Sequence, residues 1–396
     1  MAAKYQLITE LYRRTGVAVA KNPQAWQGFL SSACRNYKCR FDEQLLIYAQ
    51  RPDAVAVAKL ETWNRQFKRW VNKDSKGIAV FDPKGHRNTL KYYFDVSDTH
   101  EGYYGSRPVP IWQMDERYEQ AVMERLSDRF GDVESTDLAS ALMETAKNAV
   151  EDNLQDYFSQ LKDCTKDSFL EELDDFNIEV IYRRLAANSV AFMLISRCGL
   201  DTNEFFDRED FADIVNFNTP ATINAIGVAT SDIAEMALRE ISQSIRDVQM
   251  AKKTRIAPLH KERRLSMIKT DNNPKGANTM SEITYSRQGD YLIPDLTLPT
   301  EPELPLGRYA LMHRDYLEKH KRVTYLNLLT SGRLNGHLHE VEQTALQRLE
   351  LLTKQLSAEQ GVTEELKEKA PMQWVGRMNN IRSQAEEVIL TELIYK

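Results

Sequence analysis

Apolar residues in the first fifty positions recur at the spacing of helices. After Pro23, a residue that favours the first turn of a helix, the apolar residues between 26 and 33 share one helical face. A second helix is predicted over residues 41–50. It ends at Arg51 because the next residue is a proline, and the residue before a proline disfavours helical backbone angles.

The pattern changes to that of strands after residue 53. Runs at 54–58, 77–83 and 91–96 are rich in β-branched and aromatic residues and predict strands. A short amphipathic piece at 63–71 separates the first two runs. We therefore expect an α+β N-terminal domain over residues 1–110.

Long segments with helical periodicity follow, from 115 to 250. Glycine and proline are scarce there, and only Asn218-Thr219-Pro220 interrupts the pattern. This predicts an all-α acidic domain over residues 111–250. Residues 251–279 combine many cations with proline and glycine, a composition typical of a basic linker.

The last segment, residues 280–396, begins with strand-like runs at 283–285 and 289–296. Two apolar stripes at helical spacing follow, at 334–356 and 374–388, with Gly361 between them as a helix-terminating residue. We expect a mainly α-helical C-terminal domain that folds on its own. It would be a helical hairpin with a short N-terminal β segment.

Charge is distributed unevenly along the chain. Residues 1–92 hold 17 Lys and Arg against 7 Asp and Glu, whereas residues 93–250 hold 13 against 32. The counts are 8 against 2 for residues 251–279 and 14 against 17 for residues 280–396. Because phosphate binding needs a local cluster of cations, the asymmetry predicts a polyanion-binding N-terminal module.

Composition limits the class of protein. A length of 396 residues predicts two to three domains of about 100–200 residues each. The four cysteines are too few and too scattered for a disulfide framework, and none forms a Cys-x-x-Cys pair. The sequence has no apolar run of about 18 residues, and its first residues lack the apolar core of a signal peptide. We therefore expect a cytoplasmic protein that does not contact a membrane.

A series of residues carries a family resemblance in the N-terminal part. They are Trp26 to Leu30, Tyr37, Phe41, Gln44 to Ala54, Trp63, Trp70, Val71 and Lys76 to Ile78. In this order they resemble the single-stranded-DNA-binding N-terminal domain of ArdC-type antirestriction proteins. The start of conjugative-element helicase-like proteins is similar as well, and extends the resemblance over about 20–250. The sequence departs at Asp74, where the family has a turn glycine.

The C-terminal part carries a second, independent resemblance. Its residues are Gly289 to Leu296, Tyr325 to Gly332, Trp374 to Arg382 and Glu392 to Tyr395. Residues 280–396 resemble the transposon-encoded protein TnpV throughout. The resemblance implies a mobile element as context, and a chain formed by fusion near Met280.

Nine residues form the candidate nucleic-acid interface: Arg35, Tyr37, Lys38, Arg40, Arg51, Lys68, Arg69, Lys73 and Lys76. Cations interleaved with aromatic rings suit single-strand binding, because cations contact phosphates while rings stack on bases. Trp63, Phe67 and Trp70 follow the spacing of a helical core stripe, so packing is favoured for them. For the Tyr37 ring, base stacking and packing remain equal alternatives.

No motif for catalysis is present in the sequence. It lacks the His-Glu-x-x-His of a metalloprotease, a P-loop and the Gly-x-Ser-x-Gly of a nucleophile elbow. Asp95 and Asp98 could form a metal-binding carboxylate pair, but a turn at the end of a strand is favoured. We therefore expect no enzyme activity, no cofactor and no metal.

Two functions remain as hypotheses. The leading one is a non-enzymatic accessory protein of a mobile genetic element that binds single-stranded DNA through its basic N-terminal domain and has a host or element-encoded protein partner. The alternative is an anti-defence protein, antirestriction or anti-CRISPR-like, whose acidic helical domain binds and inhibits a host nuclease. An enzymatic function ranks third.

Overall fold

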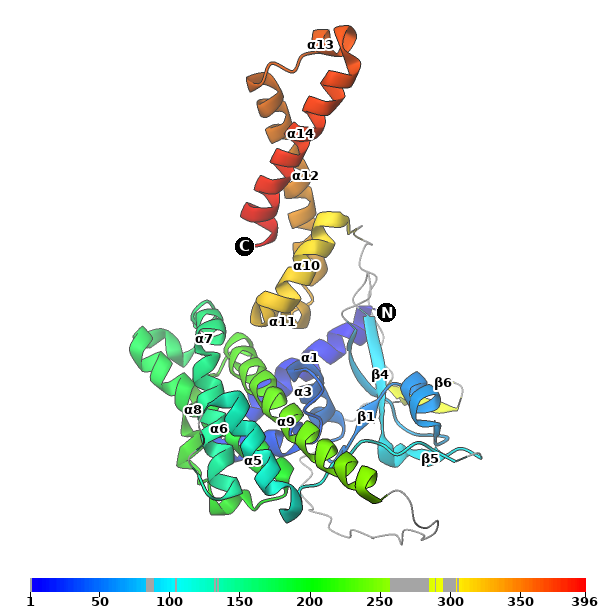
Figure 1. The fold of residues 1–396 in the computed structure, drawn as a ribbon, viewed down its shortest axis with the longest axis vertical. Helices are drawn as coiled ribbons and strands as arrows, with labels where there is room; N and C mark the ends of the chain where they lie inside the picture. Colours follow the sequence, from blue (N-terminus) through cyan, green and yellow to red (C-terminus); the bar gives the residue numbers. More distant parts are fainter. Residues whose placement is uncertain are drawn as a thin grey trace.

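The structure is a computed structural model, and it describes residues 2–82, 89–103, 105–131, 133, 135–256, 285–288, 290–294, 304 and 306–396. A helical body carries a small β unit on one side, and a helical hairpin projects from the body (Figure 1). The predicted linker over residues 251–279 lies outside the described residues from 257 onward, and Ile256 ends a helix.

Three helices open the chain: α1 (Ala2–Val19), α2 (Pro23–Ala33) and α3 (Phe41–Gln50). The helices predicted over 23–50 are confirmed, with Pro23 in the first turn of α2. The Asn22 side chain caps that helix by accepting a 2.9 Å hydrogen bond from the main-chain N–H of Ala25. Sequence reasoning missed α1, which packs on α3 with Ile8 and Tyr12 buried.

The β unit consists of short antiparallel strands. They are β1 (Val57–Ala58), β2 (Arg69–Val71), β3 (Ile78–Asp82), β4 (Thr89–Asp95) and β5 (Thr99–Glu101). Strands pair in the order β1-β4-β3, with Val80 opposite Lys91, and β2 pairs with β5. Between β1 and β2 lie α4 (Leu60–Thr62) and a π-helical turn (Trp63–Phe67), and a 3-10 turn (Val96–Asp98) joins β4 to β5. The α+β character predicted near the N-terminus is confirmed.

The helical body contains α5 (Glu116–Phe130), α6 (Leu138–Asp152), α7 (Leu154–Lys162), α8 (Asp175–Cys198) and α9 (Pro220–Ile256). The 3-10 turns Phe169–Glu172, Thr202–Glu204 and Glu209–Asn216 connect them. The predicted interruption before Pro220 is confirmed, since α9 begins at that residue. Gly227 allows α9 to approach α3, because a Cβ there would lie 2.2 Å from the Phe41 ring.

The C-terminal part consists of β6 (Tyr285–Gln288), β7 (Tyr291–Pro294), α10 (Arg308–His320), α11 (Arg322–Thr330), α12 (Leu334–Glu359), α13 (Glu364–Lys369) and α14 (Pro371–Ile389), with a final π-helical turn (Leu390–Ile394). The predicted helical hairpin corresponds to α12 and α14, which pack against each other (Figure 1). Gly361 ends the first arm in the left-handed conformation, with φ 63°.

The C-terminal part shares a core with the body. Leu326 and Leu329 of α11 are buried in the same cluster as residues of α1, α3 and α9. The main-chain N–H of Val323 donates to the Gln160 side chain at 3.0 Å, and the amide of Asn224 donates to Asn327 at 2.6 Å. This differs from the expected autonomous unit, because α11 buries its apolar side chains against the body. The domain boundaries themselves stay a prediction.

Candidate nucleic-acid interface

A groove opens between the β unit and the helical body. Its volume is about 390 Å³, in the range of sites that hold small ligands. The walls come from the loop after α2, from β1, from the turn at residues 62–67, from segment 109–113 and from α8. The lining residues are Arg35 to Cys39, Val55 to Ala58, Thr62, Trp63, Gln66, Phe67, Val109 to Gln113 and Arg197.

One wall is built on Trp63. Its indole is buried and donates a 2.9 Å hydrogen bond to the main-chain carbonyl of Phe94, so the predicted packing of this residue is confirmed. The Phe67 ring lies 5.3 Å from the Trp63 ring and is half-buried. Trp70 is 49 % exposed, contrary to the predicted core stripe. The helical turn ends at Lys68, which has φ 55°, and Trp70 then belongs to β2.

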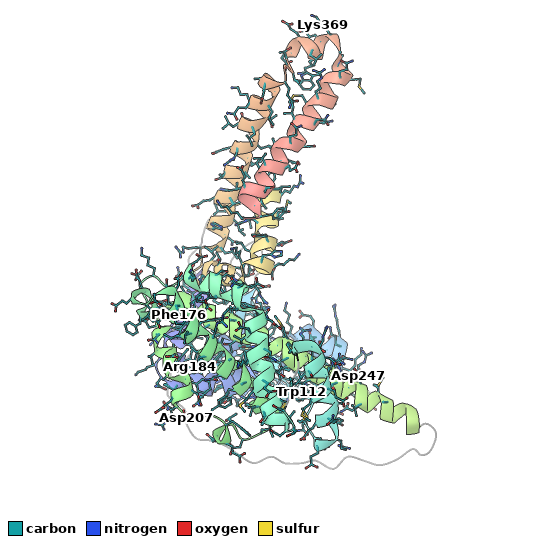
Figure 2. The ribbon with its side chains drawn as sticks, turned by 60° about the vertical axis from the view of Figure 1, so that its left-hand side comes forward. Trp112, Phe176, Arg184, Asp207, Asp247 and Lys369 are labelled. Atoms are coloured by element: carbon teal, nitrogen blue, oxygen red, sulfur yellow. The ribbon has the colours of Figure 1, made fainter. Side chains whose placement is uncertain are left out.

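A second wall contains Tyr37 and Trp112. Figure 2 labels Trp112 on the body. The Trp112 indole donates a 3.2 Å hydrogen bond to the Tyr37 hydroxyl, and both rings are buried. Of the two alternatives for Tyr37, the structure shows packing, because the ring is buried against Trp112 in the lining of the groove. It does not present an open face to solvent.

Arg197 of α8 completes this wall. Its guanidinium lies 3.7 Å from the centre of the Trp112 ring and donates a 2.8 Å hydrogen bond to the carbonyl of that residue. Burial lowers the pKa of Arg197 from its ordinary value. An arginine side chain nevertheless keeps its proton at neutral pH, so a cation faces the groove.

The charged side chains that line the groove are all cationic. Arg35, Lys38 and Arg197 line it, and none of the described lining residues is Asp or Glu. This contrasts with the whole chain, whose net charge is −6. Lys38 is exposed and its Nζ lies 5.6 Å from the centre of the Tyr37 ring. The arrangement favours an anionic ligand that also carries an apolar or aromatic part.

Four of the cations predicted for the interface form hydrogen bonds or ion pairs with other residues of the chain. Arg35 donates to the carbonyls of Ser31, Pro52 and Ala54, and Arg69 donates to Thr99. Arg40 pairs with Asp42, and Arg51 pairs with Asp98. Burial lowers the pKa of Arg40, but the carboxylates of Asp42 and Glu43 outweigh burial and raise it. These arginines hold loops together, a role that spacing alone did not distinguish from phosphate binding.

The four predicted lysines are exposed and fall into two groups. Lys38 lines the groove, and Lys68 follows the lining residue Phe67. Lys73 and Lys76 lie in the turn after β2, where the Lys76 Nζ is 4.8 Å from the centre of the Tyr285 ring. The structure thus places Arg35, Tyr37 and Lys38 in the lining of the groove, and Lys68 is only next to it in the sequence. It does not place Lys73 and Lys76 there.

Sequence reasoning missed Trp112 and Arg197. Arg197 lies in the acidic helical region, and only the fold brings it to Trp112. Trp112 follows Pro108 and Pro110, and the segment carries no periodic pattern. Its aromatic residue beside prolines is a weak signal of a fixed loop.

The Asp95 and Asp98 pair forms a turn at the end of a strand, as favoured. Asp95 is buried and accepts hydrogen bonds from the main-chain N–H groups of Val55 and Ala56 at 2.8 and 2.9 Å. Asp98 pairs with Arg51. Within the part of the chain that the structure describes, no group of three or more His, Cys, Asp or Glu residues is arranged to hold a metal ion.

Comparison with known proteins finds a similarity in the C-terminal part. Residues 284–394 match the family model of the transposon-encoded protein TnpV. No curated protein and no solved structure matches the chain. The resemblance of residues 20–250 to ArdC-type proteins stays a prediction, as do nucleic-acid binding and the nuclease-binding alternative. In the described ranges, no helix is both long and apolar enough to cross a membrane.

Proposed function

We propose that the protein is a non-enzymatic accessory protein of a transposon that binds single-stranded nucleic acid in the groove. The family match of residues 284–394 supports the transposon context. The observation that carries the binding proposal is the lining of the groove. It combines Tyr37, Trp63 and Trp112 with three cations, and none of its described residues is a carboxylate.

This combination suits a single strand better than a duplex. In a single strand the bases are unpaired, so one base can enter a cavity of about 390 Å³ while its phosphates remain at the rim. Lys38, which is exposed, supplies an ammonium group in the lining of the groove. A duplex keeps its bases paired and would have to lose a base pair first.

The negative charge of the helical body should direct a nucleic-acid strand to the groove. Residues 93–250 hold 32 Asp and Glu against 13 Lys and Arg, so most of the helical body repels phosphates. Repulsion from the body and attraction at the groove both direct a polyanion to the same place. A charge change at the groove should therefore affect binding far more than the same change elsewhere.

The test compares the affinities of the full chain for labelled oligo-dT of 20 nucleotides and for a duplex of equal length. We expect tighter binding of the single strand in a fluorescence anisotropy titration. Lys38→Glu should weaken binding about tenfold or more, since it places a carboxylate at the rim. Lys147→Glu is the matched control, because Lys147 is exposed on α6. Equal losses in the two variants, or no preference for the single strand, would refute the proposal.

A further inference from the structure

The β6–β7 hairpin, which belongs to the segment that matches TnpV, is attached to the β unit through its main chain. The N–H of Asp74 donates to the carbonyl of Asp290 at 2.8 Å, and Gly77 donates to Leu292 at 2.9 Å. The N–H of Leu292 donates in return to Ser75 at 3.1 Å. The hairpin therefore extends the β unit at the turn between β2 and β3.

The turn itself is shaped for this attachment. Asp74 has φ 63°, the left-handed conformation that glycine adopts easily. Its carboxylate pairs with Arg287 of β6. An aspartate at this position thus keeps a glycine-like backbone and adds a contact to the hairpin.

Tyr291 of β7 connects the hairpin to the groove through contacts with Phe94 and Trp63. Its ring lies 5.5 Å from the ring of Phe94, which is buried with Trp63 and Val71 in a small core separate from that of the body. The carbonyl of Phe94 in turn accepts the 2.9 Å hydrogen bond from the Trp63 indole. Tyr291, Phe94 and Trp63 therefore form a continuous series of contacts that ends at the wall of the groove.

We propose that Tyr291 is a positioning residue of the groove and that the β6–β7 hairpin braces the groove wall. This inference rests on the proposed function only for its effect on ligand binding. Six partly buried side chains of the described residues pack against the three buried ones of this core, and Tyr291 is the one among the six that comes from the segment that matches TnpV. Removing its ring would therefore take a packing partner from Phe94. Part of the segment that matches a transposon family model thus supports a site formed by the other part of the chain.

The physical reason is that the wall is built from short and irregular elements. β1 contains two residues, and the turn that follows it has the irregular geometry of a π-helix. If the Tyr291 ring is removed, Phe94 loses a packing partner and the Trp63 indole loses the fixed position of its acceptor. Residues 60–67 should then open more often, and the groove should change shape.

The test uses the full chain with Tyr291→Ala, Tyr291→Phe and the control Phe176→Ala. Phe176, labelled in Figure 2, is 74 % exposed in α8, a helix on the opposite side of the body from β6 in Figure 1. Amide hydrogen exchange in residues 60–67 should increase in Tyr291→Ala and return to the parent rate in Tyr291→Phe. The affinity for oligo-dT should fall about tenfold in the alanine variant and recover in the phenylalanine variant. The control should change neither quantity.

The two readouts separate the two proposals. If the parent protein does not bind oligo-dT, the proposed function fails. The exchange rates still test whether the hairpin supports the groove wall. Unchanged exchange in residues 60–67 of Tyr291→Ala would overturn the role of Tyr291. Faster exchange without any loss of affinity in a protein that binds oligo-dT would overturn the link from the hairpin to the groove.

Discussion

The hydroxyl of Tyr5 donates a buried 2.6 Å hydrogen bond to the main-chain carbonyl of Leu329, and so joins the first helix of the chain to α11. The Asn224 amide makes a second connection, donating to Asn327 of α11, while its carbonyl accepts from the Tyr12 hydroxyl at 2.6 Å. The segment that matches TnpV is therefore connected to the N-terminal helices and to α9 by buried polar contacts, in addition to the shared apolar core.

The shared core predicts that damage to α11 destabilises the whole chain. Leu326→Ala removes a buried side chain from the common cluster and should lower the free energy of unfolding by about 2–5 kcal/mol. Urea unfolding followed by tryptophan fluorescence should show one transition at a lower midpoint. The control Leu351→Ala alters a side chain that is 55 % exposed on α12 and should have little effect. A body transition that stays unchanged in Leu326→Ala would show that the two parts unfold independently.

The close contact between Gly227 and Phe41 predicts that Gly227→Ala destabilises the protein, although helix propensity alone favours alanine. Alanine is favoured over glycine within a helix by about 1 kcal/mol, but a Cβ at position 227 would lie 2.2 Å from the buried Phe41 ring. Overpacking of this kind costs about 1–3 kcal/mol or more, so Gly227→Ala should lower the melting temperature. Gly336→Ala is the matched control in α12, where nothing lies near the added methyl group. It should leave the melting temperature unchanged or raise it, and a similar gain from Gly227→Ala would contradict the close approach of the helices.

Two tryptophans of the β unit should respond differently to truncation. Trp63→Ala removes a buried ring and leaves the carbonyl of Phe94 without its donor, at a cost of about 3–5 kcal/mol. Trp70→Ala alters a ring that is 49 % exposed and should cost much less. Chemical denaturation of both variants tests this order. A stably folded Trp63→Ala variant would show that the ring does not support the wall.

The buried Asp232 predicts a specific pH dependence. Burial raises its pKa from 3.8 to about 6, although Arg322, whose guanidinium lies 2.8 Å away, opposes the shift. Since the folded chain favours the protonated acid, this contribution to stability is complete below about pH 4 and is lost as the pH rises through about 6. The difference between a pKa of 3.8 and one of about 6 corresponds to about 3 kcal/mol.

Asp232→Asn should therefore flatten the pH dependence of the free energy of unfolding between about pH 4 and pH 6. Urea denaturation at several pH values measures this dependence. Asp163→Asn, at an exposed position, is the control and should keep the slope of the parent protein. Equal slopes in parent and Asp232→Asn would contradict the raised pKa.

Local sequence patterns predicted the helices and strands but not how these elements pack against one another. The two helices over 23–50, the strands that contain Val80 and Lys91, the break before Pro220 and the C-terminal hairpin follow from periodicity and from proline and glycine. The packing of α11 on the body did not follow, because a helix that buries its apolar face inside one unit has the same pattern as a helix that joins two. The same limit applies to the site. Lys38 was predicted, whereas Arg197 reaches the groove only because α8 passes behind Trp112.

The proposed binding of single-stranded nucleic acid in the groove is tested most directly by the salt dependence of oligo-dT affinity. Each phosphate neutralised on a single strand contributes about −0.7 to the slope of log K against log salt concentration. With Lys38 as the exposed lysine among the described lining residues, the full chain should show a slope of about −0.7 or steeper, and Lys38→Ala should reduce its magnitude by about 0.7. A flat response of the parent protein, or an unchanged slope in Lys38→Ala, would contradict the proposal.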